Sequence, residues 1–283
     1  MQDTAPIVHH YTDIPTLALI LSTKKLRFTR LDGVSDLAET KVEKGIDFGK
    51  LFFVSCWTSN KEESIPLWRM YTPGMRGVRI SLRSDMFLKH EYVVPAELHG
   101  GKPSRPVPSP ISFGEAFADD HMILTTFLNP QSFGGSVRYV DDVEQAYQEA
   151  VQVNWKTPPE FEVEIADLCK LPRLKSRPWA FEDEFRFSLC ILPSLPLATH
   201  RSTDPEYAKQ FANHVGTCLV KGVGVSFTHK DLDLDLAALR SMEITLGPCC
   251  TKGDRVLVES LVNSFAKGAE LKVSSLSGTI RAG

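Results

Sequence analysis

The chain has 283 residues, of which 42% are hydrophobic and 24% are charged, a composition typical of a globular protein with a sizeable core. The formal net charge of −3 excludes a global basic field, so we expect no nucleic-acid binding by charge alone. Without a recognisable signal peptide or an apolar run of about 18 residues, the sequence predicts a soluble, cytoplasmic protein of bacterial type that enters no membrane.

The N-terminal segment predicts a strand, a helix and a second strand. Residues 6–12 read as a short strand, Asp13 is a helix-capping residue, and the apolar spacing that follows it is helical. Lys24 and Lys25 are expected in the last turn of this helix, where their charge suits the helix dipole. Residues 26–31 alternate as a second strand.

A buried strand and a short helix come next. Residues 51–57 form a continuous apolar run, which predicts a strand buried on both faces. A helix is predicted over residues 65–71, begun at Ser64, and residues 77–82 alternate as another strand. Residues 95–120 are rich in proline and glycine, which predicts an irregular insertion within one domain.

The second half of the chain again mixes both kinds of element. Helices are predicted over 143–155 and 254–267, and strands over 137–140, 181–192, 215–227, 242–248 and 271–276. Strands and helices are interspersed without regular βαβ units, which favours the α+β class. We therefore predict a single α+β domain over residues 1–283.

The cysteine pattern indicates free thiols. The six cysteines form no CxxC pair, and no metal-ligand spacing of histidines accompanies them. Neither a structural zinc site nor a disulfide framework is therefore expected. We predict no metal, and reduced, mostly buried thiols at Cys56, Cys169, Cys190, Cys218, Cys249 and Cys250.

Three separated stretches are candidates for one active cleft. In the first, His10-Tyr11-Thr12, a strand histidine can hydrogen-bond a ribose hydroxyl while the backbone beside it binds an amide; the alternative is an ordinary strand histidine. The second runs from Trp57 to Tyr71, and in it Trp68 and Tyr71 are three residues apart and share one helix face, which can stack on a nicotinamide or a nucleobase. For Trp68 a place in the core is the competing interpretation.

The third stretch runs from Trp179 to Arg186. On a strand, Glu182, Glu184 and Arg186 would face one side. The arginine can hold one carboxylate ionised, and a carboxylate beside a ribose can stabilise an oxocarbenium-like centre. A solvated sheet edge is the alternative.

In this order, the stretches resemble a bacterial family known as domain of unknown function 2971. The resemblance covers almost the whole chain, and its most specific part is the segment Trp179, Phe181-Glu182, Glu184 and Arg186. One departure concerns residues 35–39, Ser-Asp-Leu-Ala-Glu, which keep only the acidic positions of the family's Asn-Asp-Pro-Phe-Glu stretch.

A second, looser resemblance links the chain to ADP-ribosyltransferases. It rests on the His-x-Thr strand of His10 and Thr12, a mid-chain aromatic residue and a late strand glutamate. The resemblance implies a mixed split β-sheet with flanking helices that clamps NAD as substrate. It further implies that Glu184, rather than Glu182, stabilises the cation formed as nicotinamide leaves.

The same resemblance assigns the other site residues. His10 would bind the nicotinamide ribose, Thr12 would support its strand, and Tyr71 would stack on nicotinamide. Arginine forks suit phosphate oxygens, so pyrophosphate contacts are assigned to Arg27 and Arg30. The remaining predicted cofactor-binding residues are Tyr11 and Trp68. Glu182 is the predicted second carboxylate, and Arg186 and Trp179 are predicted to support it.

These resemblances imply an NAD-dependent ADP-ribosyltransferase that modifies a macromolecule, nucleic acid or protein. A bacterial toxin or phage-defence effector, with an antitoxin or regulatory protein as partner, fits that activity. The alternative is a non-enzymatic nucleotide-sensing or partner-binding module. A metal-dependent enzyme acting on nucleic acid through Glu182, Asp183 and Glu184 is disfavoured, because adjacent strand residues point to opposite faces.

Overall fold

The structure is a computed structural model that describes residues 5–36, 39, 48–96, 101–155, 161–165, 168, 170–195 and 205–280. Its helices are α1 (Ile14–Thr23), α2 (Ile65–Tyr71), α3 (Phe113–Ala116), α4 (Pro130–Phe133), α5 (Val143–Ala150), α6 (Pro205–Lys221), α7 (Leu236–Arg240) and α8 (Lys252–Phe265). Short 3-10 turns are η1 (Leu31–Gly33), η3 (Phe48–Lys50), η4 (Pro73–Met75), η6 (Thr125–Leu128), η7 (Leu171–Arg173) and η8 (Arg177–Glu182).

The strands of the first half are β1 (Ile7–Thr12), β2 (Lys25–Arg30), β3 (Phe52–Thr58), β4 (Val78–Arg83), β5 (His90–Tyr92), β6 (Val107–Ser109), β7 (His121–Ile123), β8 (Gly134–Ser136) and β9 (Arg138–Val140). Those of the second half are β10 (Val151–Trp155), β11 (Phe161–Ile165), β12 (Leu174–Ser176), β13 (Glu184–Pro193), β14 (His229–Asp233), β15 (Glu243–Leu246) and β16 (Glu270–Val273). None of these helices combines the length and the apolar character needed to cross a membrane.

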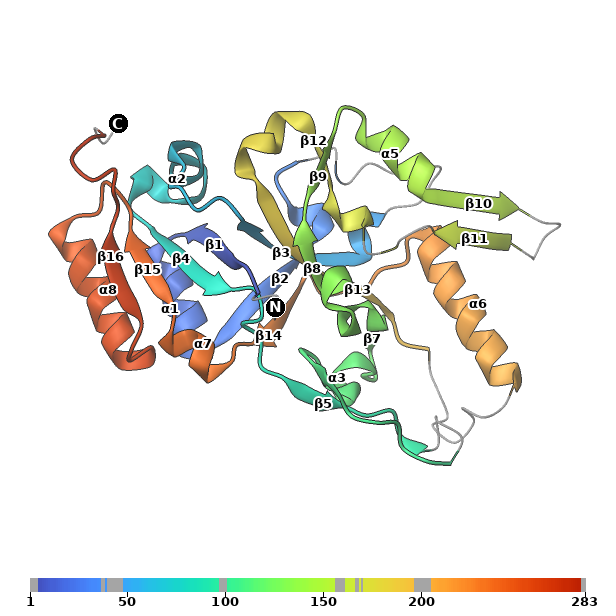
Figure 1. Ribbon diagram of the computed structural model, residues 1–283. Helices are drawn as coiled ribbons and strands as arrows, with labels where there is room; N and C mark the ends of the chain where they lie inside the picture. Colours follow the sequence, from blue (N-terminus) through green and yellow to red (C-terminus); the bar gives the residue numbers. More distant parts are fainter. Residues whose placement is uncertain are drawn as a thin grey trace.

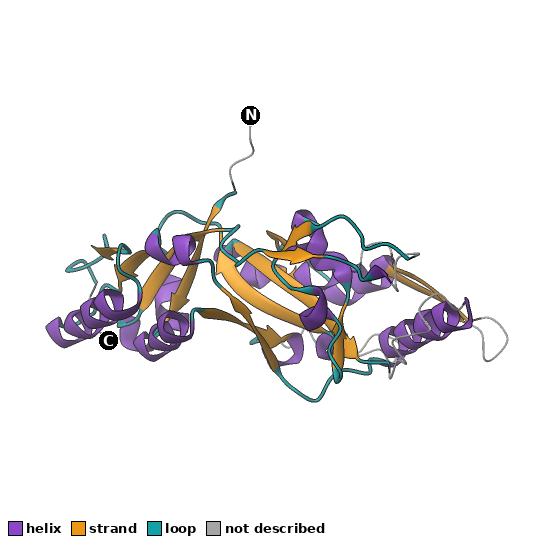
Figure 2. Ribbon diagram, turned by 90° about the horizontal axis from the view of Figure 1, so that it is seen from below, coloured by secondary structure: helices purple, strands orange, loops and turns teal. Residues whose placement is uncertain are grey.

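A mixed sheet with flanking helices organises the molecule, which confirms the α+β class (Figure 1). Its strand order is β14-β2-β3-β1-β4-β15-β16, and β13 adds to β3 and also carries β7 and β8. The β15–β16 pair is parallel, and the pairs among β1, β2, β3, β4 and β13 are antiparallel. Seen from below, the strands occupy the middle of an elongated molecule with helices at both ends (Figure 2).

Strand β3 is the point at which the sheet divides. Along one edge it pairs with β13 from Thr58 to Phe52. On its other side it pairs with β2 at Phe53 and Val54, but its only register pair with β1 in the described structure joins Thr58 to His9. Strand β1 then continues along β4 over all six of its residues. Strands β1 and β3 therefore separate beyond the His9–Thr58 pair.

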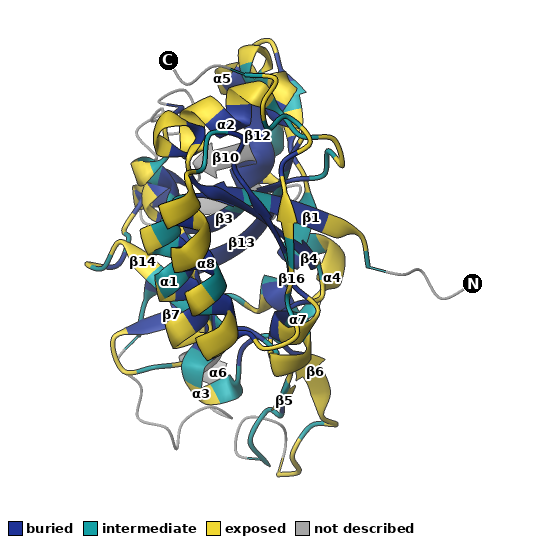
Figure 3. Ribbon diagram, turned by 90° about the vertical axis from the view of Figure 1, so that its left-hand side faces the viewer, coloured by how far each residue is buried: buried dark blue, intermediate teal, exposed yellow. Residues whose placement is uncertain are grey.

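The two faces of the β1–β4 region bury different layers. Because strand side chains alternate, Val8 and Ile80 face the main core with α1 and α8, whereas Tyr11 faces the cluster that includes Trp68 of α2. Figure 3 shows β3 and β13 buried at the centre and exposed outer faces on α1 and α8. Helix α2 and the α1–α8 pair therefore lie on opposite sides of these strands.

Local sequence signals explain where α1 begins and ends. The Asp13 carboxylate accepts a 2.7 Å hydrogen bond from the Thr16 backbone N–H, as a helix-capping residue should. Lys24 takes the left-handed conformation, with φ 57°, and stops the helix after Thr23. The expectation that Lys24 and Lys25 occupy the last helical turn is therefore wrong, and Lys25 already belongs to β2.

Two predicted elements of the second half differ in part from the structure. The helix expected over 143–155 ends at Ala150, and residues 151–155 form β10, because their β-branched and aromatic residues favour a strand paired with β11. The strand expected over 215–227 is largely the end of α6. Val215, Cys218 and Leu219 have helical spacing and pack in one buried cluster, and Gly222, with φ 60°, follows the helix end.

The proline-rich segment 95–120 is only partly irregular. Strand β6 pairs with β5, and α3 begins at a capping box in which Ser112 and Glu115 satisfy each other's backbone N–H groups. Residues 97–100 lie outside the described part of the chain. The described part of this segment is therefore held to the domain by pairing with β5.

Candidate functional site

A cavity of about 80 Å³ lies where β1 and β3 separate. Its walls come from β1, β3, α2, η8 and the first residue of β13. The residues that line it are His9, His10, Tyr11, Cys56, Trp57, Thr58, Leu67, Tyr71, Glu182 and Glu184. The fold thus brings all three candidate stretches of the sequence to one cavity, although 111 residues separate Tyr71 from Glu182.

His10 bridges the two separating strands. Its Nδ1 lies 2.9 Å from the Cys56 carbonyl oxygen of β3, and its ring centroid lies 5.2 Å from that of Trp57. Burial lowers the pKa of His10, although the hydrogen bond to the carbonyl opposes the shift. The neutral ring must carry its proton on Nδ1, because a carbonyl only accepts, so Nε2 is an acceptor.

The two aromatic residues of α2 have different surroundings. Trp68 is fully buried, packs edge-on against Tyr11 at 4.8 Å and donates from Nε1 to Glu63 over 3.0 Å. The expectation that Trp68 forms a ligand-stacking face with Tyr71 is therefore wrong, because Trp68 belongs to the core. Tyr71 is 40% exposed, lines the cavity and donates a 2.6 Å hydrogen bond from its hydroxyl to Glu182.

Tyr11 and Thr12 contribute to the frame of the site. The Tyr11 hydroxyl accepts a 3.0 Å hydrogen bond from the backbone N–H of Ser64, the residue that caps α2. Thr12 is buried and pairs with Val78 of β4, outside the residues that line the cavity. Tyr11 thereby fixes the start of the helix that carries Tyr71.

The acidic stretch does not form one continuous strand. Residues 177–182 form η8, Asp183 takes the left-handed conformation with φ 43°, and β13 begins only at Glu184. The predicted strand over 181–192 is thus wrong at its start. The turn at Asp183 nevertheless lets both glutamates converge on Lys175, whose Nζ lies 2.5 Å from Glu182 and 2.9 Å from Glu184.

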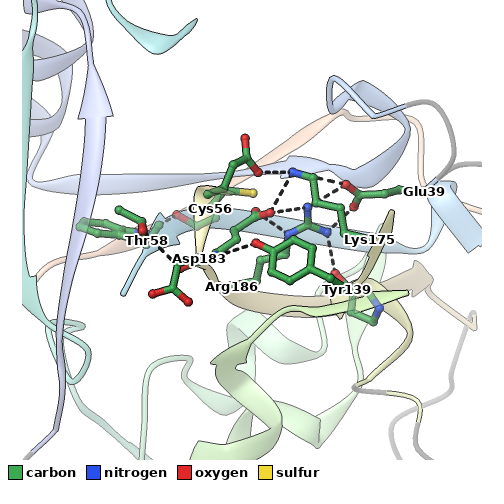
Figure 4. Close-up of polar contacts among 12 residues, drawn as sticks. Glu39, Cys56, Thr58, Tyr139, Lys175, Asp183 and Arg186 are labelled. Atoms are coloured by element: carbon green, nitrogen blue, oxygen red, sulfur yellow. Dashed lines mark hydrogen bonds and ion pairs between the residues drawn. The ribbon is translucent and has the colours of Figure 1, made fainter. Parts of the chain in front are cut away.

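A buried ion network lies beneath the cavity (Figure 4). Arg186 bonds Glu184 through Nε at 2.6 Å and Nη2 at 3.0 Å, and it holds Glu39 through Nη1 and through Nη2 at 2.9 Å. Lys175 completes the network, in which every side chain is at least nine-tenths buried. With Glu182, three carboxyl groups face two cations. Burial raises the pKa of Glu39, although the charges of Arg186 and Lys175 oppose the shift.

The network keeps Glu184 ionised. Burial alone would raise its pKa, but the charges of Arg186 and Lys175 and a hydrogen bond from Cys56 outweigh burial and lower the pKa to about 2. Burial likewise opposes the charged form of Lys175, yet the carboxylates around it raise its pKa. Burial and the bond to Glu182 raise the pKa of Tyr71, so its hydroxyl stays protonated.

Four residues of the site received no role from the sequence. Cys56 lines the cavity, and burial and the charge of Glu184 raise its thiol pKa well above the ordinary value, so it is a neutral donor rather than a nucleophile. The Tyr139 hydroxyl accepts a 2.8 Å hydrogen bond from the Glu184 backbone N–H. Lys175 and Glu39 complete the four, and Glu39 had appeared only as one of the acids retained in residues 35–39.

The structure does not bring Arg27 and Arg30 to the cavity. Arg27 pairs with Asp231 of β14 at 2.9 Å, and Arg30 pairs with Asp32 at 2.8 Å. Neither arginine is among the residues that line the cavity, so their predicted contact with a pyrophosphate is not supported. Trp179 lies at the edge of the site, with its ring centroid 4.8 Å from Lys175 Nζ.

Comparison with known proteins gave no match: no protein-family model, curated protein or solved structure matches the chain. Membership of the family named above and an ADP-ribosyltransferase fold therefore stay predictions. In the described parts of the chain, no three His, Cys, Asp or Glu side chains gather as a possible metal site.

The arrangement suits one kind of chemistry. An ionised carboxylate, Glu184, lies at a cavity whose other walls are largely aromatic or aliphatic. A fixed negative charge in such surroundings stabilises a positive charge that develops on a bound group. The neutral His10 offers an acceptor and Tyr71 offers a partly exposed ring, so the cavity can hold a flat, hydroxyl-bearing ligand at the carboxylate.

Proposed function

We propose that the chain is an NAD-dependent ADP-ribosyltransferase. The observation that supports this most is the convergence of His10, Tyr71 and Glu184, from three distant segments, on one cavity. Each has the chemistry that cleavage of a nicotinamide–ribose bond requires: an acceptor for a ribose hydroxyl, a ring for stacking and an ionised carboxylate.

In this proposal Glu184 is the catalytic carboxylate. As the bond to nicotinamide breaks, positive charge develops on the ribose, and a carboxylate already ionised needs no proton loss to stabilise it. His10 accepts a hydrogen bond from the ribose through Nε2. Tyr71 stacks on the leaving nicotinamide, and Glu182, bound to Tyr71 and Lys175, is the supporting second carboxylate.

The size of the cavity sets how much of NAD it receives. Complete small-molecule pockets hold roughly 300–1,000 Å³, whereas this one holds about 80 Å³. The cavity therefore takes the nicotinamide end only, and the rest of the dinucleotide lies outside it. A macromolecular acceptor would approach from the same open side, and a bacterial toxin or defence effector of the family proposed above would use such a site.

Nicotinamide release from NAD tests the proposal. Wild type is compared with Glu184→Gln, and Asp254→Asn is the matched control, because Asp254 is also a buried carboxylate paired with an arginine, Arg76, but lies outside the cavity lining. Removal of an electrostatic stabiliser lowers turnover about 100- to 1,000-fold, so Glu184→Gln should lose release that Asp254→Asn keeps. A cell lysate that accelerates release would indicate a transferase with a macromolecular acceptor.

A non-enzymatic nucleotide-binding module is the second candidate. It is favoured by one observation: both carboxylate oxygens of Glu184 already accept hydrogen bonds from Arg186 or Lys175. Such a module would bind NAD, as seen by calorimetry, without releasing nicotinamide from it in the presence or absence of lysate. Release by wild type alone rejects the module.

A further inference from the structure

Arg79 is a buried cation whose hydrogen-bond partner in the described structure is a backbone carbonyl. It lies within β4 and is 6% exposed. Its Nη2 donates to the Lys61 carbonyl oxygen over 2.6 Å, and its guanidinium carbon lies 5.9 Å from the ring centroid of Tyr11. In the described residues no carboxylate forms an ion pair with Arg79, and its Nε has no hydrogen-bond partner. A carbonyl and a ring face offset only part of the cost of burying this charge.

Other arginines of the chain show what is missing at Arg79. Seven of the described arginines, exposed or buried, bond a carboxylate through their guanidinium groups: Arg27 to Asp231, Arg76 to Asp254, Arg83 to Asp85, Arg177 to Asp141, Arg30 to Asp32, Arg255 to Glu259, and Arg186 to Glu39 and Glu184. Arg79 is far less exposed than the first four of these, so it has less water to compensate its charge.

A second unsatisfied group lies beside Arg79. The β1–β4 register pairs His9 with Ser81 and Tyr11 with Arg79, so all four side chains share one face. His9 is 7% exposed and lines the cavity, and its Nδ1 lies 2.8 Å from the Ser81 hydroxyl. Its Nε2 is buried and has no partner among the described residues.

The tautomer of His9, set by its bond to Ser81, decides whether this second group is a donor. Burial and the nearby charge of Arg79 lower the pKa of His9 to about 4, so the ring is neutral at neutral pH. When the Ser81 hydroxyl donates to Nδ1, the proton of the neutral ring resides on Nε2. In that tautomer two N–H groups lack acceptors among the described residues: Nε2–H of His9, which lines the cavity, and Nε–H of Arg79, which lies behind the lining on the same strand face. A buried donor without an acceptor is costly.

We propose that His9 and Arg79 form an anion subsite that receives phosphate oxygens of the ligand bound in the cavity. A phosphate supplies the missing acceptors and the missing negative charge at once. The identity of the carrier rests on the proposed function, in which the phosphate belongs to the pyrophosphate of NAD. Arg79 then takes the role that the sequence assigned to Arg27 and Arg30.

Thermal unfolding with added anions tests the subsite without any turnover. Pyrophosphate, inorganic phosphate, ADP-ribose and nicotinamide are added separately to wild type, Arg79→Met and Arg27→Met at matched ionic strength. A ligand that binds only the folded state raises Tm. Pyrophosphate and ADP-ribose should stabilise wild type and Arg27→Met, and Arg79→Met should bind them about 10- to 100-fold more weakly. Stronger stabilisation by ADP-ribose than by free phosphate would assign the anion to a nucleotide.

Arg79→Met separates a ligand-binding role from a structural one. If Arg79 is kept for a ligand, the variant without ligand unfolds at or above the Tm of wild type, because an apolar chain replaces an unpaired buried cation. Equal stabilisation of Arg79→Met and wild type by pyrophosphate, or no stabilisation of wild type by any phosphate, overturns the subsite. If Arg79→Met does not fold, His9→Asn gives the same test, since it keeps a partner for Ser81 but lacks Nε2. Phosphate binding without nicotinamide release would keep the subsite and reject the proposed function.

Discussion

The Tyr71 hydroxyl on α2 donates a 2.6 Å hydrogen bond to Glu182 at the end of η8 and so joins two walls of the cavity. Because Glu182 also contacts Lys175, this bond links the aromatic wall to the ion network below it. A ligand that stacks on Tyr71 therefore lies close to the carboxylates. The predictions below separate the contributions of the ring, the hydroxyl and the network.

The ring of Tyr71 should matter more than its hydroxyl. Tyr71→Phe removes the hydrogen bond to Glu182, but Glu182 keeps Lys175 as a partner. The free energy of unfolding should therefore fall by about 1 kcal/mol, and the rate of nicotinamide release should fall by less than tenfold. Tyr71→Ala removes the stacking surface and should lower kcat/KM about tenfold, for about 1–1.5 kcal/mol of aromatic contact. Steady-state kinetics of both variants check this, and equal activity of the two would contradict the stacking role.

Glu39 should contribute to stability although it lies outside the cavity lining. Glu39→Gln leaves part of the Arg186 charge uncompensated in a buried site, and the free energy of unfolding should fall by about 3–5 kcal/mol. Urea unfolding measures the loss. In a double-mutant cycle, Glu39→Gln and Arg186→Met together should cost less than the sum of the single changes. Additive losses would mean that the two side chains act independently.

The depressed pKa of Glu184 predicts loss of stability in acid. Its pKa is about 2 in the folded chain and 4.5 as the ordinary value, so the unfolded chain binds more protons between these limits. Its contribution, about 3 kcal/mol, is complete above pH 4.5 and is lost as the pH falls toward 2. Urea unfolding from pH 7 to pH 3 should show a steeper decline for wild type than for Glu184→Gln. Parallel declines would contradict the depressed pKa.

Lys24→Gly should stabilise the protein. Lys24 holds φ 57° at the end of α1, where glycine has no side chain to strain, so a gain of about 0.5–1 kcal/mol is expected. Lys25→Gly is the matched control, because Lys25 lies in β2 and pairs with Asp233, and it should destabilise. Thermal unfolding of both variants distinguishes the two positions, and a loss of stability in Lys24→Gly would contradict the conformational argument.

Local signals predicted the first third of the fold well. Asp13 and Ser64 each cap a helix as expected, and the apolar run of residues 51–57 became the buried strand β3. Such features depend on neighbours in sequence, which the chain displays directly. The alternation rule failed at Asp183, because a left-handed residue ends η8 there and lets Glu182 and Glu184 meet by another path.

Long-range partners could not be predicted. Arg27 looked like a phosphate ligand, but its partner Asp231 is 204 residues away in the chain and lies beside it only because β14 pairs with β2. Arg79 looked like an ordinary strand residue, and only the fold shows that it is buried with a backbone carbonyl as its hydrogen-bond partner. The sequence shows which residues are charged, whereas the groups that neutralise each charge are set by the tertiary structure.

The most direct test of the proposed function is nicotinamide release from NAD by equal amounts of folded wild type, Glu184→Gln and Asp254→Asn, with lysate as the source of acceptors. The proposal predicts release by wild type and Asp254→Asn and a loss of about 100- to 1,000-fold in Glu184→Gln. Equal release by all three proteins, or none by folded wild type under any condition, would contradict it.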